Sequence, residues 1–155
     1  NLTGIMPIYD SSAFIKRTEY YSLHHLLSEQ GMPESVAIYT SGNSHRGGSI
    51  KIDIAVFYPN QGIWAQYETY VNEFDVEDVI KICPLHTHVE MELYPPGDPD
   101  SFYSHLDQTN WRYIKGGAKP LEEAASMSIE EFYQTFRDPT DQCFETPVDI
   151  LPPPS

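Results

Sequence analysis

Hydrophobic and polar residues alternate along two long segments near the middle of the chain. In the first, residues 50–58, the apolar side chains occupy every second position: Ile50, Ile52, Ile54, Val56 and Tyr58. Residues 63–71 repeat the pattern, and the intervening Pro59-Asn-Gln-Gly62 has the composition of a turn. Because strand side chains alternate between two faces, this pattern predicts an antiparallel hairpin with one buried face.

A helical period precedes the hairpin. Three leucines at i, i+3 and i+4 predict a helix over residues 22–30, with Ser22 as its N-cap: Leu23, Leu26 and Leu27. Gly31 suits the C-terminal cap, and Pro33 prevents the helix from continuing. Residues 35–40 then predict a strand.

Residues 95–99, rich in proline, break the regular pattern, and residues 100–120 read as irregular. A capping-box sequence, Ser128-Ile-Glu-Glu131, predicts a second helix to about Arg137. The expected fold class is α+β, with a four-to-five-stranded, mostly antiparallel sheet and two helices packed on one face. We expect one domain over residues 1–155, with extended ends at 1–17 and 148–155.

Residues 79–94 predict one long strand that carries the candidate chemistry. Its odd positions from Cys83 to Leu93 are mainly apolar, whereas its even positions are polar: His86, His88, Glu90 and Glu92. The strand is therefore expected to be buried on one side. Its polar side indicates either a metal site or a solvated sheet face.

The spacing of His86, His88 and Glu92 resembles the first metal motif of cupins, which are small β-barrels. That resemblance implies one divalent metal ion held by these three residues, and a metalloenzyme as an alternative function. The chain departs from the cupin pattern in its glycines, and no second motif follows, because His105 is the only later histidine.

The chain is strongly acidic, with a formal net charge of −14 and a pI of about 4.6, and this limits the classes of partner that it can bind. Both values argue against nucleic acid and anionic membranes, and they suit a cationic partner or simple solubility. No apolar run reaches the roughly 18 residues that a membrane-spanning helix needs. The chain begins at Asn1, so we expect that a signal peptide, a lipoprotein anchor or another segment preceded it.

Two further groups of residues are candidates for binding or stability. Cys83 and Cys143 would form a disulfide in an exported protein, and a buried thiol at Cys83 is the alternative. Aromatic residues are numerous, and four of them are candidates for a recognition surface, with core packing as the alternative: Trp64, Tyr70, Trp111 and Tyr113.

The order helix, Gly-x-Pro corner, strand, loop and hairpin over about residues 20–71 resembles the small exported lipoproteins of the SmpA/OmlA/BamE type and the related β-lactamase-inhibitor-like modules. The residues that carry this resemblance are Leu26-Leu-Ser-Glu-Gln-Gly31-Met-Pro33-Glu-Ser-Val36 and Ile54-Ala-Val-Phe-Tyr58-Pro-Asn-Gln-Gly62-Ile63. It implies a non-catalytic module that binds other proteins through a sheet face or loops, often at a bacterial cell envelope. No individual functional residue carries over.

The expected function is therefore a non-catalytic, exported bacterial domain, derived from a lipoprotein and without a cofactor, that binds an unidentified protein. The cupin-like metal protein is the main alternative. A third interpretation, a domain that binds a small ligand, predicts a deep apolar pocket.

Overall fold

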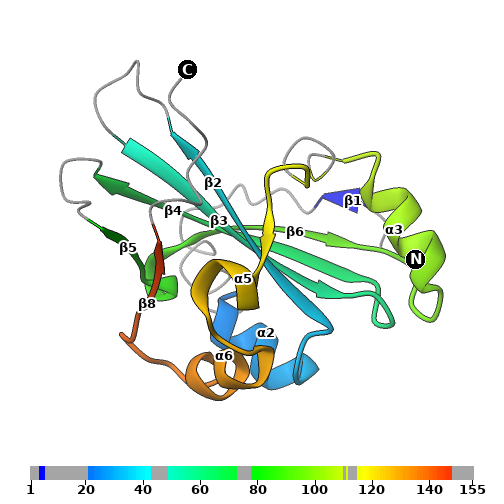
Figure 1. The fold of residues 1–155 in the computed structure, drawn as a ribbon. Helices are drawn as coiled ribbons and strands as arrows, with labels where there is room; N and C mark the ends of the chain where they lie inside the picture. The colour runs from blue at the N-terminus through cyan, green and yellow to red at the C-terminus, as the bar shows by residue number, and fades with distance from the viewer. Residues whose placement is uncertain are drawn as a thin grey trace, which may run out of the picture.

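The computed structural model describes residues 4–5, 21–42, 49–72, 78–109, 111 and 115–147. Within these ranges the chain has an α+β fold, as the sequence predicts. Figure 1 shows a twisted sheet with most of the helices gathered on one side of it. The expected extended ends, 1–17 and 148–155, lie outside the described residues apart from Gly4 and Ile5.

The main sheet is antiparallel between all neighbours in the order β1-β6-β4-β3-β2-β7. Its four long strands are β2 (Ser35–Gly42), β3 (Ser49–Tyr58), β4 (Ile63–Asn72) and β6 (His88–Leu93). The two-residue strands β1 (Gly4–Ile5) and β7 (Lys119–Pro120) pair with β6 and β2. The predicted hairpin is confirmed as β3 and β4, which pair from Ser49–Asn72 to Tyr58–Ile63.

A second, two-stranded sheet pairs β5 (Val79–Ile82) with β8 (Phe144–Pro147). Between β5 and β6 lies a short 3₁₀ helix, η2 (Pro84–His86). The last strand of the described chain is therefore brought back beside residues more than 60 positions earlier, because Ile80 pairs with Thr146 and Ile82 with Phe144.

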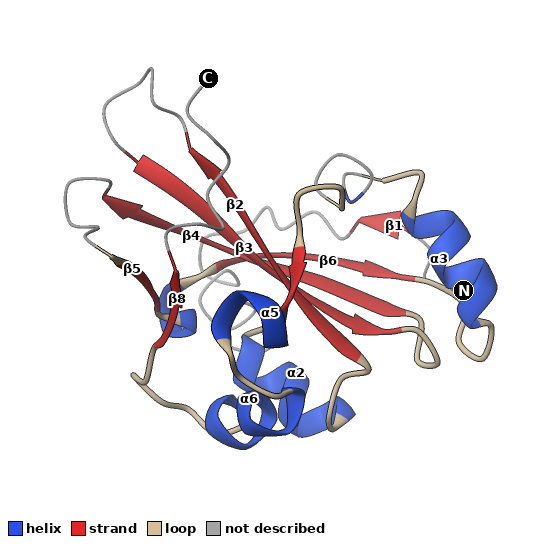
Figure 2. Cartoon of the chain, in the orientation of Figure 1, coloured by secondary structure: helices blue, strands red, loops and turns tan. Residues whose placement is uncertain are grey.

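Three helices cover one face of the main sheet, which we call the helix face: α2 (Leu23–Gln30), α5 (Leu121–Ala125) and α6 (Ile129–Phe136). The two helices predicted here are α2 and α6, and α5 joins them (Figure 2). The alternating apolar residues of β3 and β4 point into this core, which also takes the leucines of α2 and the phenylalanines of α6. Burial of this shared surface fixes the sheet register, because a shift of one residue would turn every apolar side chain outward.

The predicted helix ends are also confirmed. The backbone of Gly31 has a φ of 81°, and its amide donates to the Leu27 carbonyl at 2.9 Å, which closes α2. At α6, the Ser128 hydroxyl accepts from the Glu131 amide at 3.1 Å, and the Glu131 carboxylate accepts from the Ser128 amide at 2.8 Å. This reciprocal pair is the predicted capping box.

A helix forms where the sequence reads as irregular. It is α3 (Pro99–Leu106), begun by Asp98, whose carboxylate accepts from the Ser101 amide at 3.0 Å. Its Phe102 and Leu106 pack against the opposite face of the sheet in a second core cluster. In Figure 1, α3 lies beside β1 at one end of the sheet, away from α2, α5 and α6.

Candidate functional site

The predicted strand over residues 79–94 is wrong as a single element. It is divided into β5, η2 and β6, so His86 lies in a 3₁₀ turn and not on the strand that carries His88. Pro84 explains the break, because it fixes φ and has no amide to donate to a continuing ladder. The side chain of His86 is outside the described residues.

The strand β6 separates the other two candidate metal ligands. His88 and Glu92 pair in continuous register with Glu68 and Trp64 of β4. Four strand residues span roughly 13 Å, which is too far for one ion to bind both side chains in this register. Across the described part of the chain, no group of three or more His, Cys, Asp or Glu residues is placed to hold a metal ion.

Glu92 is also more enclosed than a solvated strand position would be. Its side chain is only 6 % exposed, and the Tyr94 hydroxyl donates to its carboxylate. Burial raises the pKa of Glu92, the hydrogen bond from Tyr94 partly opposes this shift, and the neighbouring charge of Glu90 adds to it. The Glu92 carboxyl therefore belongs to the packed end of the sheet near α3.

The four candidate recognition aromatics do not form one surface. Trp64 is fully buried and belongs to the second core cluster, so of the two alternatives given for it the structure shows core packing. Trp111 is half-buried against the same cluster, with its ring centroid 4.9 Å from that of Phe57 and 6.5 Å from that of Trp64. Tyr113 lies outside the described residues. Tyr70 alone of the described three is exposed, at 61 %.

Tyr70 belongs to the sheet surface opposite the helix face. We call this surface the polar face, and in the four long strands its polar members include Tyr39, Lys51, Asp53, Gln66, Glu68, Tyr70, His88 and Glu90. Strand alternation places them here, because their neighbours in sequence point into the core under the helices. One row of directly paired residues crosses the four strands β2, β3, β4 and β6: Tyr39, Asp53, Glu68 and His88.

One lysine lies between two carboxylates on the polar face. The Lys51 ammonium is 2.8 Å from Glu68 Oε2 and 3.5 Å from Asp53 Oδ2. Tyr70 donates its hydroxyl to Glu68 Oε1. Glu68 therefore orients both Lys51 and the exposed tyrosine ring.

This arrangement shifts the pKa values of the two carboxyl groups in opposite directions. Burial raises the pKa of Asp53, although the hydrogen bond from Gln66 and the charge of Lys51 oppose it. At Glu68 burial acts in the same direction, but the hydrogen bonds from Lys51 and Tyr70 outweigh it and lower the pKa. For Lys51, burial by itself would lower the pKa, and the two carboxylates raise it instead.

Two oxygen atoms on the polar face are buried without a hydrogen-bond partner in the described part of the structure: Asp53 Oδ2 and Gln66 Oε1. Their residues are joined to each other through Gln66 Nε2, which donates to Asp53 Oδ1 at 2.9 Å. The buried carboxylate has only the Lys51 ammonium, at 3.5 Å, to compensate its charge. Both oxygens are therefore buried acceptors without a hydrogen-bond donor among the described residues.

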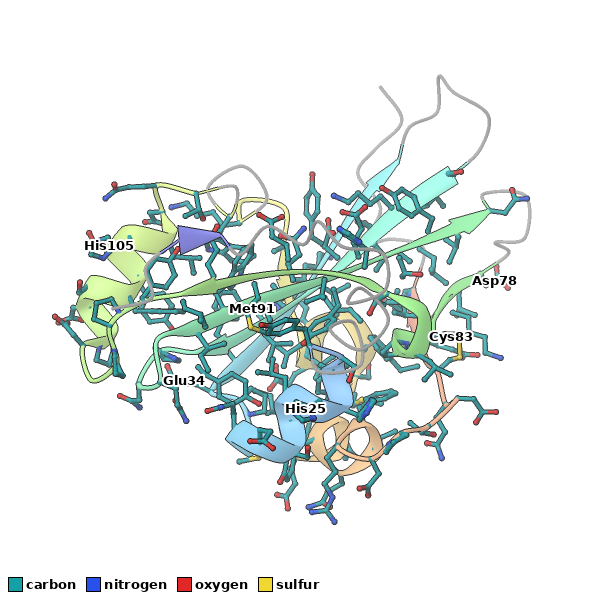
Figure 3. All side chains as sticks on the ribbon, turned by 180° about the vertical axis from the view of Figure 1, so that it is seen from behind. His25, Glu34, Asp78, Cys83, Met91 and His105 are labelled. Carbon is teal, nitrogen blue, oxygen red and sulfur yellow. A yellow bond between two sulfur atoms is a disulfide. The ribbon has the colours of Figure 1, made fainter. Side chains whose placement is uncertain are left out.

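The two cysteines form a disulfide, Cys83–Cys143, across a sequence separation of 60 residues. Figure 3 labels Cys83 at the end of β6 that is far from His105 of α3. Of the two alternatives left open for Cys83, the structure shows the disulfide. It joins the residue before η2 to the segment that follows α6.

A pocket of about 320 Å³ lies next to this disulfide. It is lined by the start of α2, by β4, η2 and β6, and by the segment after α6, including Leu23, His24, Tyr67, Leu85, Phe136 and Asp138. The lining is partly apolar and partly polar, whereas the third interpretation of the sequence predicts a deep apolar pocket. No sequence motif links these residues, because they come from segments as far apart as Ser22 and Thr140.

Comparison of the chain with family models, with curated proteins and with solved structures found no match. The resemblances to cupins and to the SmpA/OmlA/BamE type therefore stay predictions. Among the described residues there is no helix long and apolar enough to cross a membrane.

Proposed function

We propose that this chain is a non-catalytic binding domain of an exported bacterial protein, and that it binds a protein partner through the polar face. The observation that carries the proposal is Tyr70, which is 61 % exposed and is oriented by its hydrogen bond to Glu68. An aromatic ring already held in place loses little conformational entropy on binding, and tyrosine is enriched at protein interfaces.

The charge of the polar face favours a partner with basic residues. Among its described residues the polar face carries Asp53, Glu68 and Glu90 against one lysine, Lys51, and the whole chain has a formal net charge of −14. Such a field attracts a positively charged surface and repels nucleic acid and anionic lipid. Complementary charge mainly raises the association rate and fixes the orientation of the partner.

Export is supported by the disulfide. Structural disulfides form and persist in oxidising compartments such as the bacterial periplasm and the cell surface, and they are rare in the cytosol. The resemblance over residues 20–71 supports the same location, a non-catalytic role and a lipoprotein anchor upstream. In this proposal the domain needs no cofactor.

Site-specific photo-crosslinking in the producing cell tests the binding surface. A photoreactive amino acid at Tyr70 or His88 is expected to trap one specific partner, whereas the same group at Met32, which is 54 % exposed after α2, is expected to trap none. A partner trapped equally from Met32, or none from Tyr70 and His88, would contradict the proposal.

A charge-reversal pair then tests the chemistry of the trapped partner. Glu90→Lys on the polar face is expected to weaken binding of the partner and to make that binding less dependent on ionic strength. Glu122→Lys on the exposed side of α5 is the matched control.

Thiol trapping of Cys83 and Cys143 in intact cells tests export, because a fully reduced pool in the cytosol would contradict it.

A further inference from the structure

The pocket beside the disulfide is separate from the polar face. Its strand residues, Tyr67 and Val89, belong to the helix face of β4 and β6, and their neighbours Glu68 and Glu90 point to the other side. A volume of about 320 Å³ lies at the lower end of the range for small-molecule sites, roughly 300–1,000 Å³. The residues that line the pocket therefore determine which ligand it can bind.

The interior of the pocket is apolar. Leu23 and Phe136 are each 3 % exposed, Tyr67 is fully buried, and Val89 packs against the same core. The Tyr67 hydroxyl donates to the Tyr21 carbonyl at 3.0 Å, so this polar group is satisfied within the protein. These side chains close the floor of the pocket, and the exposed apolar side chain of its lining is Leu85, at 46 %.

The rim of the pocket presents hydrogen-bond acceptors and one negative charge. Thr87 donates its hydroxyl hydrogen to the Pro84 carbonyl at 3.0 Å, and Ser22 Oγ lies 3.3 Å from His24 Nε2. Asp138 supplies the carboxylate, whose distance to Arg137 Nε is 3.9 Å and whose side chain is 83 % exposed. The described lining residues include neither lysine nor arginine, and Arg137 reaches the rim through its ion pair with Asp138.

The disulfide holds two walls of the pocket together. Cys83 directly precedes the lining residues Pro84 and Leu85, and Cys143 follows the lining residue Thr140 by three residues. A covalent link between the walls reduces the ordering that a ligand must impose on them. The pocket is thus preorganised in the oxidised protein.

We propose that this pocket binds a small organic cation, an apolar body that carries a protonated amine. The body lies against Leu85 and over the floor formed by Leu23, Val89 and Phe136, and the ammonium group faces Asp138 at the rim. The apolar interior provides affinity, and the carboxylate provides the preference for positive charge.

Calorimetric and NMR titrations with hexylamine, hexanol and hexanoate at neutral pH test this inference, because the three probes differ only in their polar group. Saturable hexylamine binding, roughly tenfold tighter than that of hexanoate with hexanol between them, is expected from the reversed charge interaction at the rim. Failure of all three probes to bind saturably, or hexanoate binding as tightly as hexylamine, would overturn it.

Three variants locate the binding. Asp138→Asn is expected to reduce hexylamine binding to the level of hexanol, and Asp141→Asn, the same change at an exposed position outside the lining, is expected to leave it unchanged. Val89→Phe fills the interior and is expected to abolish binding of every probe. Because Val89→Phe alters the core, Asp138→Asn on an exposed side chain decides the result: unchanged hexylamine affinity there would overturn the assignment even if Val89→Phe fails to fold.

Discussion

Cys83 and Cys143 are covalently joined although 60 residues separate them, and their bond ties the turn before β6 to the segment after α6. Between these two cysteines lie β6, α3, β7, α5 and α6, so the bond closes a large loop of the fold.

Removal of this bond is expected to destabilise the fold. A loop of about 60 residues corresponds to roughly 4 kcal/mol in the chain-entropy description of disulfides. Urea unfolding of the Cys83→Ala/Cys143→Ala double variant, compared with the oxidised and the reduced wild type, measures this loss. The reduced wild type serves as the control for side-chain replacement, and a loss below about 1 kcal/mol in both would contradict a stabilising role.

Gly62 is expected to tolerate substitution less well than Gly31. Both have positive φ, 69° and 81°, but a Cβ at Gly62 would lie 2.2 Å from the Tyr94 carbonyl oxygen, and a Cβ at Gly31 would meet nothing within 4 Å. Gly31→Ala should therefore cost about 1–3 kcal/mol for its backbone conformation alone, because φ 81° with ψ −160° is adopted almost only by glycine. Gly62→Ala should cost more, since the turn and Tyr94 must also separate. Equal losses for the two variants in thermal or urea unfolding would contradict this close approach.

Truncation of Trp64 and of Tyr70 is expected to change the free energy of unfolding by very different amounts, although the two residues lie on the same side of β4. Trp64→Ala should lower the free energy of unfolding by about 3–5 kcal/mol, because the ring is fully buried against the second core cluster. Tyr70→Ala should change it by less than about 0.5 kcal/mol, because the ring is exposed, while weakening partner binding. A large loss of stability in Tyr70→Ala would assign that residue to the core instead.

Asp53 is expected to make the fold less stable as the pH rises. Its pKa is raised in the folded protein, mainly by burial, so the folded state holds this proton more tightly than the unfolded chain does. The resulting contribution is fully present below the ordinary pKa of an aspartate and is lost as the pH rises through the folded pKa. Asp53→Asn removes this titration, and urea unfolding from about pH 3 upward should show that the variant gains stability relative to wild type over that range.

A matched change at Asp78 separates this effect from net charge. Asp78 is exposed, and Asp78→Asn removes the same charge as Asp53→Asn. The relative stability of Asp78→Asn should therefore follow wild type through the pH range. The same pH profile for both variants would mean that overall charge, and not burial of Asp53, sets the dependence.

Glu92 is not expected to hold a metal ion together with His88. Their separation along β6, roughly 13 Å over four residues, prevents one ion from binding both in this register. Elemental analysis after incubation with Zn²⁺ or Mn²⁺ should give the same metal content for wild type, His88→Ala and Glu92→Gln. A bound ion lost in both variants would support the cupin-like alternative and would require β6 to change its register.

The local sequence was sufficient to predict the elements that depend mainly on residues close to one another in the chain. Alternation over 50–71 predicts the hairpin and its buried face, and the caps at Gly31 and Ser128 predict where α2 ends and α6 begins. A signal for α3 was also present, because Asp98-Pro99 combines an N-cap with a proline suited to the first turn. The prolines before it, Pro95 and Pro96, and the aromatic residues after it hid this signal.

Only the tertiary structure decided which polar and aromatic side chains meet solvent. Trp64 and Tyr70 share one side of β4, so alternation cannot tell them apart, and the difference comes from α3, whose Phe102 and Leu106 cover Trp64 at one end of the polar face. The disulfide partners and the pocket likewise depend on segments that are far apart in the sequence. Local pattern fixes the period and the turns, because these depend on neighbours in sequence; burial depends on long-range packing that the pattern does not contain.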